Sequence, residues 1–224
     1  MRKTFGLCFL ALTLTAGVAH AQGVFLEKGQ PGVSATAGGA VIGTGWSGSV
    51  APSYTYRGMF DVGLDVTGYG FTSGDANHLK AIGVMPFTTV YLARSEEGPS
   101  PVSISGTLGV QKRYYVGNGN APNPDGWGLL VGGSAFRRIA LTNTFAGIPE
   151  FFIAYDMQSI TWHSTVLDGN AAIGPGQKTK YDHKVRLLFR ANMGFQAEKT
   201  LYTLCPYLGY EAGFAAGLNV GAIF

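Results

Sequence analysis

Charged side chains are sparse in this sequence, and many of them fall on the polar faces of segments whose residues alternate between apolar and polar. Of the 224 residues, 13% are Asp, Glu, Lys or Arg and 46% are hydrophobic. Alternation places successive residues on opposite faces of a β-strand. The segments therefore predict strands with one apolar and one polar face. The polar and charged residues that fall on the polar faces are Asp61, Asp65, Arg113, Asp156, Gln158, Lys184, Arg186, Arg190 and Glu211.

Acidic and basic groups of this set would meet if the strands closed into a barrel with the polar faces inside. An isolated charge is costly to bury, so these groups should pair or contact water. One possible chemistry is a structural network that fills the lumen, and the other is a narrow polar pore whose charges select solutes. We expect Asp61, Asp65 and Asp156 to supply the partners of Arg186 and Arg190.

Catalytic and metal-binding patterns are weak. His163 and Ser164 are adjacent, so in a strand their side chains point to opposite faces and cannot directly form a nucleophile–base pair. No Cys/His cluster has the spacing of a metal site. Two acid–histidine pairs lack any surrounding motif: Asp75 with His78, and Asp182 with His183. We therefore expect no enzymatic activity, no cofactor and no metal.

The chain ends on a strand, and this strand suggests how the others are arranged. Its apolar face carries Phe214, Ala216, Leu218, Val220, Ala222 and Phe224. In a water-soluble protein, an apolar strand at the chain end would add little stability, because chain termini usually fray. The closing strand of a barrel in lipid gains much, because an open sheet edge there leaves backbone groups without hydrogen bonds.

About ten segments can be interpreted as strands, which predicts an all-β, closed antiparallel transmembrane barrel; eight strands is the alternative. The weakest segment covers residues 80–94, which alternate poorly and include Pro86, and residues 127–139 do not define which face points inward. An even number of strands places both ends of the barrel in the periplasm. Residues 43–48 and 142–149 are then expected to be turns, and the expected extracellular loops are 72–78, 117–126 and 166–181.

The N-terminus predicts export. Arg2 and Lys3 precede an apolar run, and Ala19-His20-Ala21 forms a cleavage site, so residues 1–21 are expected to be a signal peptide and residues 22–224 the barrel domain. Removing two of the 16 basic residues leaves them nearly balanced by the 13 acidic ones, which gives no reason to expect nucleic-acid binding. Cys205 is then the single cysteine, so no internal disulfide is expected.

Together, the signal peptide, alternating strands, longer connections on one side and terminal Phe224 resemble the small bacterial outer-membrane β-barrels of the OmpA/OmpX-like, porin-like superfamily. The resemblance covers the mature chain and is architectural. It implies a cell-envelope protein of a Gram-negative outer membrane, with outer-membrane lipid, lipopolysaccharide, the barrel-assembly machinery and periplasmic chaperones as partners. Leu218, Val220, Ala222 and Phe224 resemble the assembly signal of these barrels, with a departure at Ala222, where an aromatic residue is often found.

Three functions remain open from the sequence. The first is a non-enzymatic barrel that is either structural or forms a narrow polar channel with a charged lumen. The second is a surface adhesin or receptor that acts through its extracellular loops. The third is a lipid-modifying outer-membrane enzyme, because lipid A deacylases resemble this chain in size.

Overall fold

The computed structural model describes residues 23–43, 45–71, 80–95, 100–116, 125–164, 167–168, 171–172, 176–211 and 213–224, so the expected signal peptide lies outside the described residues. A short 3-10 helix, η1 (Gly23–Phe25), precedes the strands. The strands are β1 (Gly32–Ile42), β2 (Gly45–Tyr56), β3 (Phe60–Phe71), β4 (Lys80–Ala93), β5 (Ser103–Val116), β6 (Asp125–Phe136), β7 (Ile139–Ala140), β8 (Phe145–Ser164), β9 (Leu167–Asp168), β10 (Ala171–Ala172), β11 (Gly176–Ala197), β12 (Thr200–Glu211) and β13 (Phe214–Ile223).

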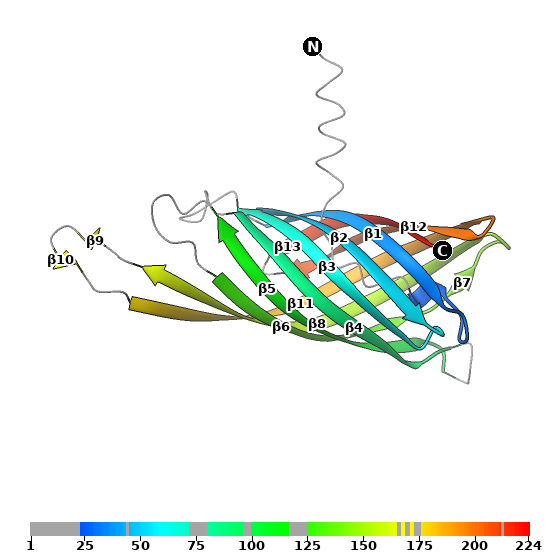
Figure 1. Cartoon of the computed structure of the whole chain (residues 1–224). Helices are drawn as coiled ribbons and strands as arrows, with labels where there is room; N and C mark the ends of the chain where they lie inside the picture. Colours follow the sequence, from blue (N-terminus) through cyan, green and yellow to red (C-terminus); the bar gives the residue numbers. More distant parts are fainter. Residues whose placement is uncertain are drawn as a thin grey trace, which may run out of the picture.

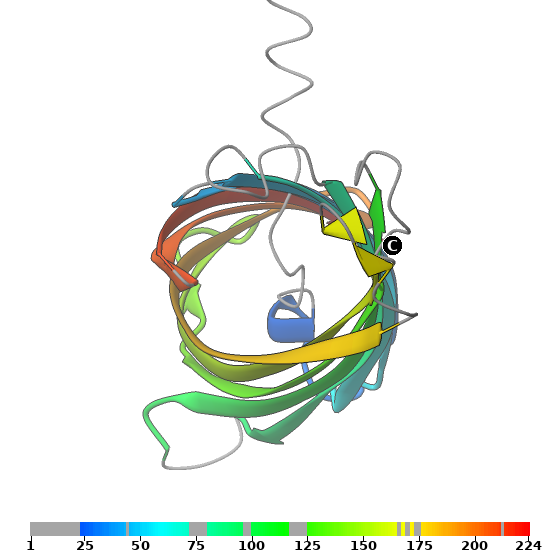
Figure 2. The ribbon, with the colours of Figure 1, turned by 90° about the vertical axis from the view of Figure 1, so that its left-hand side faces the viewer.

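Ten of these strands close into one antiparallel barrel (Figures 1 and 2). The order β11-β12-β13-β1-β2-β3-β4-β5-β6-β8 is joined into a ring by the pairing of β8 with β11. The short β7 pairs with the start of β8, and β9 and β10 form a separate small hairpin. The prediction of a closed ten-stranded antiparallel barrel is confirmed, and the eight-stranded alternative is wrong.

The two ends of the barrel differ. At one, called here the turn end, β1 begins, β13 ends and short connections join β2 to β3 and β11 to β12. At the other, the loop end, β8 and β11 run past the remaining strands toward β9 and β10 (Figure 1). The register pairs Gly176 with Ser164 and Tyr181 with Ser159. The prediction that residues 166–181 form one loop is therefore wrong for 176–181. This part of the strand was missed because a hairpin that extends beyond the barrel has polar residues on both faces and lacks the apolar–polar alternation.

Two predicted turns are shorter than expected. Strand β2 already begins at Gly45, so residues 45–48 are strand. Strand β8 begins at Phe145, although Gly147 and Pro149 had indicated a turn. Pro149 is exposed on the outside of the barrel, and its carbonyl oxygen accepts a hydrogen bond from Arg137 N at 3.3 Å. The inward residues at the start of β8 were missed for this reason.

Strand β4 is continuous although Pro86 lies inside it. Pro86 pairs with Leu64 on β3, while the pairing with β5 passes directly from Val84 to Phe87. A proline has no N–H to donate and is tolerated where the ladder is interrupted. The poor alternation of β4 has a second cause: Met85 and Phe87 point inward, so both faces of the strand are partly apolar.

The outer surface of the barrel carries an apolar belt. Phe151, Ile153, Val185 and Phe189 face outward, and each is about half exposed to the surroundings. Many other large apolar side chains from the ten strands share this face, which is far more than a monomeric water-soluble protein exposes. Alternation of apolar residues outside with polar residues inside is the pattern of membrane-spanning barrels. Among the described residues, the structure contains no helix with the length and hydropathy needed to cross a membrane.

Candidate functional site in the barrel lumen

The turn end of the lumen is closed by the segment that precedes β1. Figure 2, which looks along the barrel, places η1 (blue) inside the ring of strands. Val24 and Phe25 are 3% and 5% exposed and belong to an apolar cluster with Phe136, Ile148 and Ile223. We call Val24, Phe25 and Leu26 the lumen plug. From the sequence, this segment had been assigned to the barrel domain, and its burial in the lumen was not predicted.

Arg94 fastens the lumen plug to the wall. Its Nη1 donates a hydrogen bond to the Leu26 carbonyl oxygen at 2.6 Å, and its Nη2 donates one to the Gly58 carbonyl oxygen. The guanidinium lies 4.5 Å from the ring centre of Tyr91, whose hydroxyl donates to Asp61 Oδ2 at 2.7 Å. Gly58 has φ +60°, and a Cβ there would lie 2.2 Å from the Glu27 carbonyl oxygen, so only glycine fits this approach.

Above the lumen plug lies a fully buried charged group, the Arg190 cluster (Glu150, Arg190 and Asn192). Arg190 Nη1 lies 3.3 Å from Glu150 Oε1, and Asn192 Nδ2 donates to Glu150 Oε2 at 2.9 Å. The side chains of Arg190 and Glu150 are 1% and 3% exposed. Arg190 Nη2 and Asn192 Oδ1 have no hydrogen-bond partner among the described residues. The cluster is therefore sealed from bulk solvent and has two polar atoms without a partner in the described part of the chain, which makes it sensitive to the loss of either charge.

An apolar layer follows, made of Met85, Leu130, Phe152, Leu188 and Tyr207. These side chains are all between 1% and 4% exposed. Phe152 also faces the Arg190 guanidinium, at 4.4 Å from ring centre to Cζ. Side chains that face a lumen wide enough for water would be accessible to it. The lumen is therefore filled at this height, and the next cavity above, about 10 Å³, has room for about one water molecule.

Toward the loop end the lumen contains a second polar group, the Arg186 network (Asp156, Arg186, Gln158, Arg113, Gln111 and Tyr69). Arg186 Nη2 and Gln158 Nε2 both donate to Asp156 Oδ2. Arg113 continues the chain by donating to Gln158 Oε1 and to Gln111 Oε1, and Gln111 donates to Tyr69 Oη at 3.1 Å. Arg186 is 11% exposed, more than any charged group in the Arg190 cluster. The network thus faces the open end of the lumen.

The structure does not gather the predicted lumen residues into one site. Arg113, Asp156, Gln158 and Arg186 meet in the Arg186 network, and Arg190 lies below the apolar layer. Asp61 accepts from Tyr91, and Asp65 accepts from Thr67. Lys184 pairs with Asp182 at 2.9 Å in a half-exposed position. Glu211 pairs in register with Arg186 through the backbone, and its side chain lies outside the described residues.

The partner of Arg190 differs from the candidates expected from the sequence. Glu150 is directly opposite Arg190 in the register of β8 and β11, whereas Asp156 pairs with Arg186. Glu150 was overlooked because it follows Pro149 and the predicted turn. Leu188 and Phe152 are apolar, so polarity alone could not have shown that they face the lumen. Phe151 faces outward, so continuing the strand alternation toward Pro149 would have placed Glu150 on the inward face.

The chain-terminal residues expected to form an assembly signal lie on the outside of β13. Leu218, Val220 and Ala222 are half-buried and Phe224 is 67% exposed. Phe224 N donates to the Val33 carbonyl oxygen at 2.8 Å, and Val33 N donates to the Phe224 carbonyl oxygen at 3.2 Å. The last residue therefore completes the seam between the first and last strands.

The acid–histidine pairs do not form a catalytic arrangement where they are described. His183 Nδ1 lies 2.7 Å from the Tyr155 hydroxyl, while Asp182 pairs with Lys184 on the other face. Asp75 and His78 lie outside the described residues, as do the side chains of His163 and Ser164. Within the described residues, no group of three or more His, Cys, Asp or Glu side chains could hold a metal ion.

No protein-family model and no curated protein match this sequence. Among solved structures, the chain is similar to the N-terminal β-barrel domain of OprF from Pseudomonas aeruginosa, with 13% identity over 88% of this chain and 100% of that one and a TM-score of 0.36. It is also similar to the β domain of the Bordetella autotransporter BrkA, with 11% identity over 87% and 98% and a TM-score of 0.44. These values carry no argument about function. The assignment as an outer-membrane-type barrel rests on the strand pairing and the apolar belt described above.

Proposed function

We propose that this chain is a non-enzymatic, integral protein of the bacterial outer membrane with a closed lumen, and that its role is structural. The observation that carries the proposal is the filled lumen inside an apolar outer belt. The belt supports residence in a bilayer, and the filling argues against a diffusion channel. In the membrane, the turn end would face the periplasm and the loop end the exterior.

Closure of the lumen does not depend on one side chain. The lumen plug, the Arg190 cluster and the apolar layer follow one another along the axis, because the register aligns Asn192 with Ile148, Arg190 with Glu150 and Leu188 with Phe152. Rearranging the Arg186 network alone would leave the other layers in place. A solute path would need several buried layers to move at once, which supports a structural barrel over a narrow polar channel.

Single-protein recordings in planar bilayers test this proposal. We expect the purified, folded chain to show no stepwise conductance, with folding checked by a heat-dependent shift in gel migration. A reproducible unit conductance from folded protein would contradict the closed lumen and restore the channel hypothesis. Recovery of the protein from the soluble periplasmic fraction of cells would contradict the membrane location independently.

Outer-membrane lipid, lipopolysaccharide, the barrel-assembly machinery and periplasmic chaperones are the partners that this role requires. Phe224 offers the most direct test, because its side chain is exposed and its backbone joins β13 to β1. We expect deletion of Phe224 to slow membrane insertion and to raise the amount of aggregated periplasmic chain. Unchanged insertion kinetics would mean that the terminal aromatic is not used for assembly.

The long β8–β11 hairpin favours a second candidate function, binding of a partner at the cell surface. Strand β11 pairs with β8 from Gly176 onward, but its pairing with β12 begins only at Arg186. The edge of β11 from residue 176 to 185 has no partner strand among the described residues, and open edges can add a strand from another chain. Shortening this hairpin while keeping the barrel should abolish cell-surface binding if this function is present.

A further inference from the structure

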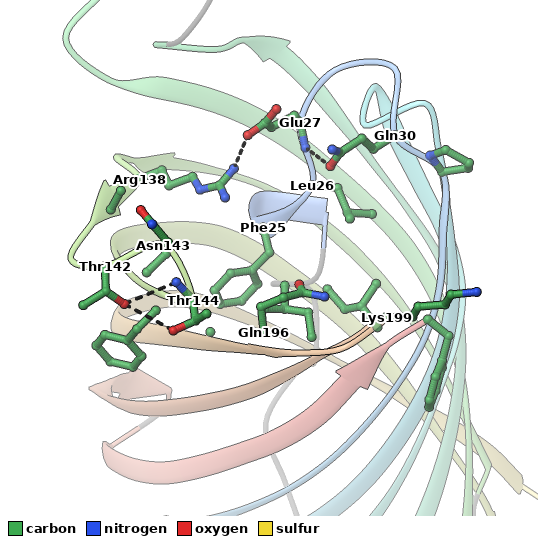
Figure 3. Close-up of a pocket in the computed structure, with 18 residues that line it drawn as sticks. Phe25, Leu26, Glu27, Gln30, Arg138, Thr142, Asn143, Thr144, Gln196 and Lys199 are labelled. Atoms are coloured by element: carbon green, nitrogen blue, oxygen red, sulfur yellow. Dashed lines mark hydrogen bonds and ion pairs between the residues drawn. The ribbon is translucent and has the colours of Figure 1, made fainter.

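A pocket of about 390 Å³ lies at the turn end, separate from the filled part of the lumen (Figure 3). Its lining comes from four places: the lead that contains Phe25 and Glu27, the segment from Arg138 to the start of β8, the turn from β11 to β12, and the end of β13 with Phe224. The volume falls within the range of small-molecule and peptide-end sites. Exposed Asn143, Thr144 and Gln196 mark its open side.

The floor of the pocket is apolar and tightly packed. Phe25 and Ile223 are 5% and 4% exposed, and Leu26 and Leu201 pack against the same cluster. Phe145 and the exposed Phe224 also line the pocket, so its surface is partly aliphatic and partly aromatic. The floor formed by Leu26, Leu201 and Ile223 can therefore receive one aliphatic side chain.

The walls are rich in carboxamides. Gln30, Asn143 and Gln196 each present an N–H₂ donor and a carbonyl acceptor, which is the complement of a peptide bond. Gln30 Oε1 and Gln196 Nε2 are used within the protein, since they bond to Glu27 N at 3.1 Å and to the Glu198 carbonyl oxygen at 2.9 Å. The other amide groups of these three side chains make no hydrogen bond to the described residues, so a ligand can bond to them.

Arg138 supplies the positive charge. Figure 3 shows its side chain reaching inward beneath Glu27, whereas the Lys199 side chain points away from Phe25 and Gln196. Arg138 Nη1 contacts Glu27 Oε1 at 3.0 Å, and both side chains are partly exposed, at 31% and 59%. A pair this exposed is weak and exchanges readily. The rest of the guanidinium makes no hydrogen bond within the described residues, so it can bind a second carboxylate.

We propose that this pocket binds the free C-terminal end of an extended peptide with an aliphatic last residue. The terminal carboxylate would meet Arg138, the last peptide bond the carboxamides, and the aliphatic side chain the floor at Leu201 and Leu26. The last two residues of a peptide form the smallest group that can reach Arg138, the carboxamides and the apolar floor together. A neutral sugar has no carboxylate for Arg138 and would use only part of the pocket.

Calorimetric titration of the folded, full-length chain in detergent micelles tests the proposal, with acetyl-Gly-Leu as the probe. We expect saturable binding that weakens about tenfold when the carboxylate is replaced by a carboxamide and also weakens for acetyl-Gly-Gly. Acetyl-Gly-Gly-Gly-Gly-Leu should bind at least as well if the natural ligand is a protein C-terminus. Much weaker binding of this longer peptide would point to free dipeptides instead.

The neighbouring Arg137 provides a matched control, because it is exposed and does not line the pocket. Arg138→Gln should lower the affinity for acetyl-Gly-Leu about tenfold, and Arg137→Gln should leave it unchanged, with both variants showing the folded gel mobility. Absence of saturable binding, equal affinity for the carboxylate and carboxamide probes, or an equal loss in both variants would overturn the proposal.

Discussion

The Arg190 cluster and the Arg186 network each contain one arginine–carboxylate pair, but the surroundings of the two pairs differ. Each joins one arginine of β11 to one carboxylate of β8. The Arg190 cluster lies between the lumen plug and the apolar layer, and Arg190 Nη2 has no hydrogen-bond partner among the described residues. The Arg186 network instead extends through four more side chains toward the loop end. A barrel lumen can thus hold one charge pair sealed between buried layers and another next to its open end, and the contributions of the two pairs to stability should differ.

Removing the charge of Arg190 should have the largest effect. Arg190→Leu leaves Glu150 as an unpaired charge at 3% exposure, which is expected to lower the free energy of unfolding by about 3–5 kcal/mol. Urea unfolding in lipid vesicles, followed by tryptophan fluorescence, measures this change. A loss below about 1 kcal/mol would show that water reaches Glu150 and that the lumen is not dry at this height.

Removing both charges should restore much of that stability. An apolar replacement for a buried ion pair is often neutral, because the desolvation of both charges is avoided. We expect the double variant Glu150→Leu, Arg190→Met to be about 2 kcal/mol more stable than Arg190→Leu, with the loss of the Asn192 hydrogen bond limiting the recovery. If the double variant is as unstable as the single one, the Arg190 cluster acts through packing and not through charge.

The same substitution in the Arg186 network should cost less. After Arg186→Leu, Asp156 keeps its hydrogen bond from Gln158 at 2.7 Å, and Arg113 remains bonded to Gln158 as a second positive charge, which Glu150 lacks in the Arg190 cluster. We therefore expect a loss of about 1–2 kcal/mol in the same unfolding assay. A loss equal to that of Arg190→Leu would mean that the two polar groups are equally sealed from water.

The smallest effect is expected on the outer face, directly next to Arg190. Phe189 faces outward and is 54% exposed, so lipid covers leucine at this position as it covers phenylalanine. Phe189→Leu should change the free energy of unfolding by about 0.5 kcal/mol or less. A larger loss than for Arg186→Leu would mean that the inside and outside of β11 had been assigned in reverse.

The strand number and the facing of most strands could be predicted because a membrane barrel separates its two faces by polarity. Strand β11 follows this rule, with Phe189 outside and Arg190 inside. The rule fails where the lumen is filled by apolar side chains. Met85 and Phe87 on β4 and Leu130 on β6 point inward, and both strands had therefore appeared ambiguous in the sequence.

The candidate sites were harder to predict, because they depend on packing between distant segments. Glu150 lies 40 residues from Arg190, and only the register of β8 with β11 brings the two together. The lumen plug lies just after the expected signal peptide, where a short apolar segment had no assigned partner. Val24, Phe25 and Leu26 are three consecutive apolar residues, which is the signal that could have suggested burial.

The lumen plug also constrains the order of folding. Phe25 packs in the same cluster as Ile223, so one of the first described residues depends on a strand that is synthesised after all the other described strands. Contacts between such distant parts of a chain form slowly, because a long loop must close before they contribute. We expect Val24, Phe25 and Leu26 to remain exposed on the exported, unfolded chain until β13 docks against β1. A holding chaperone would then have its most persistent target at the N-terminal end, and that target would disappear in the same step that closes the barrel.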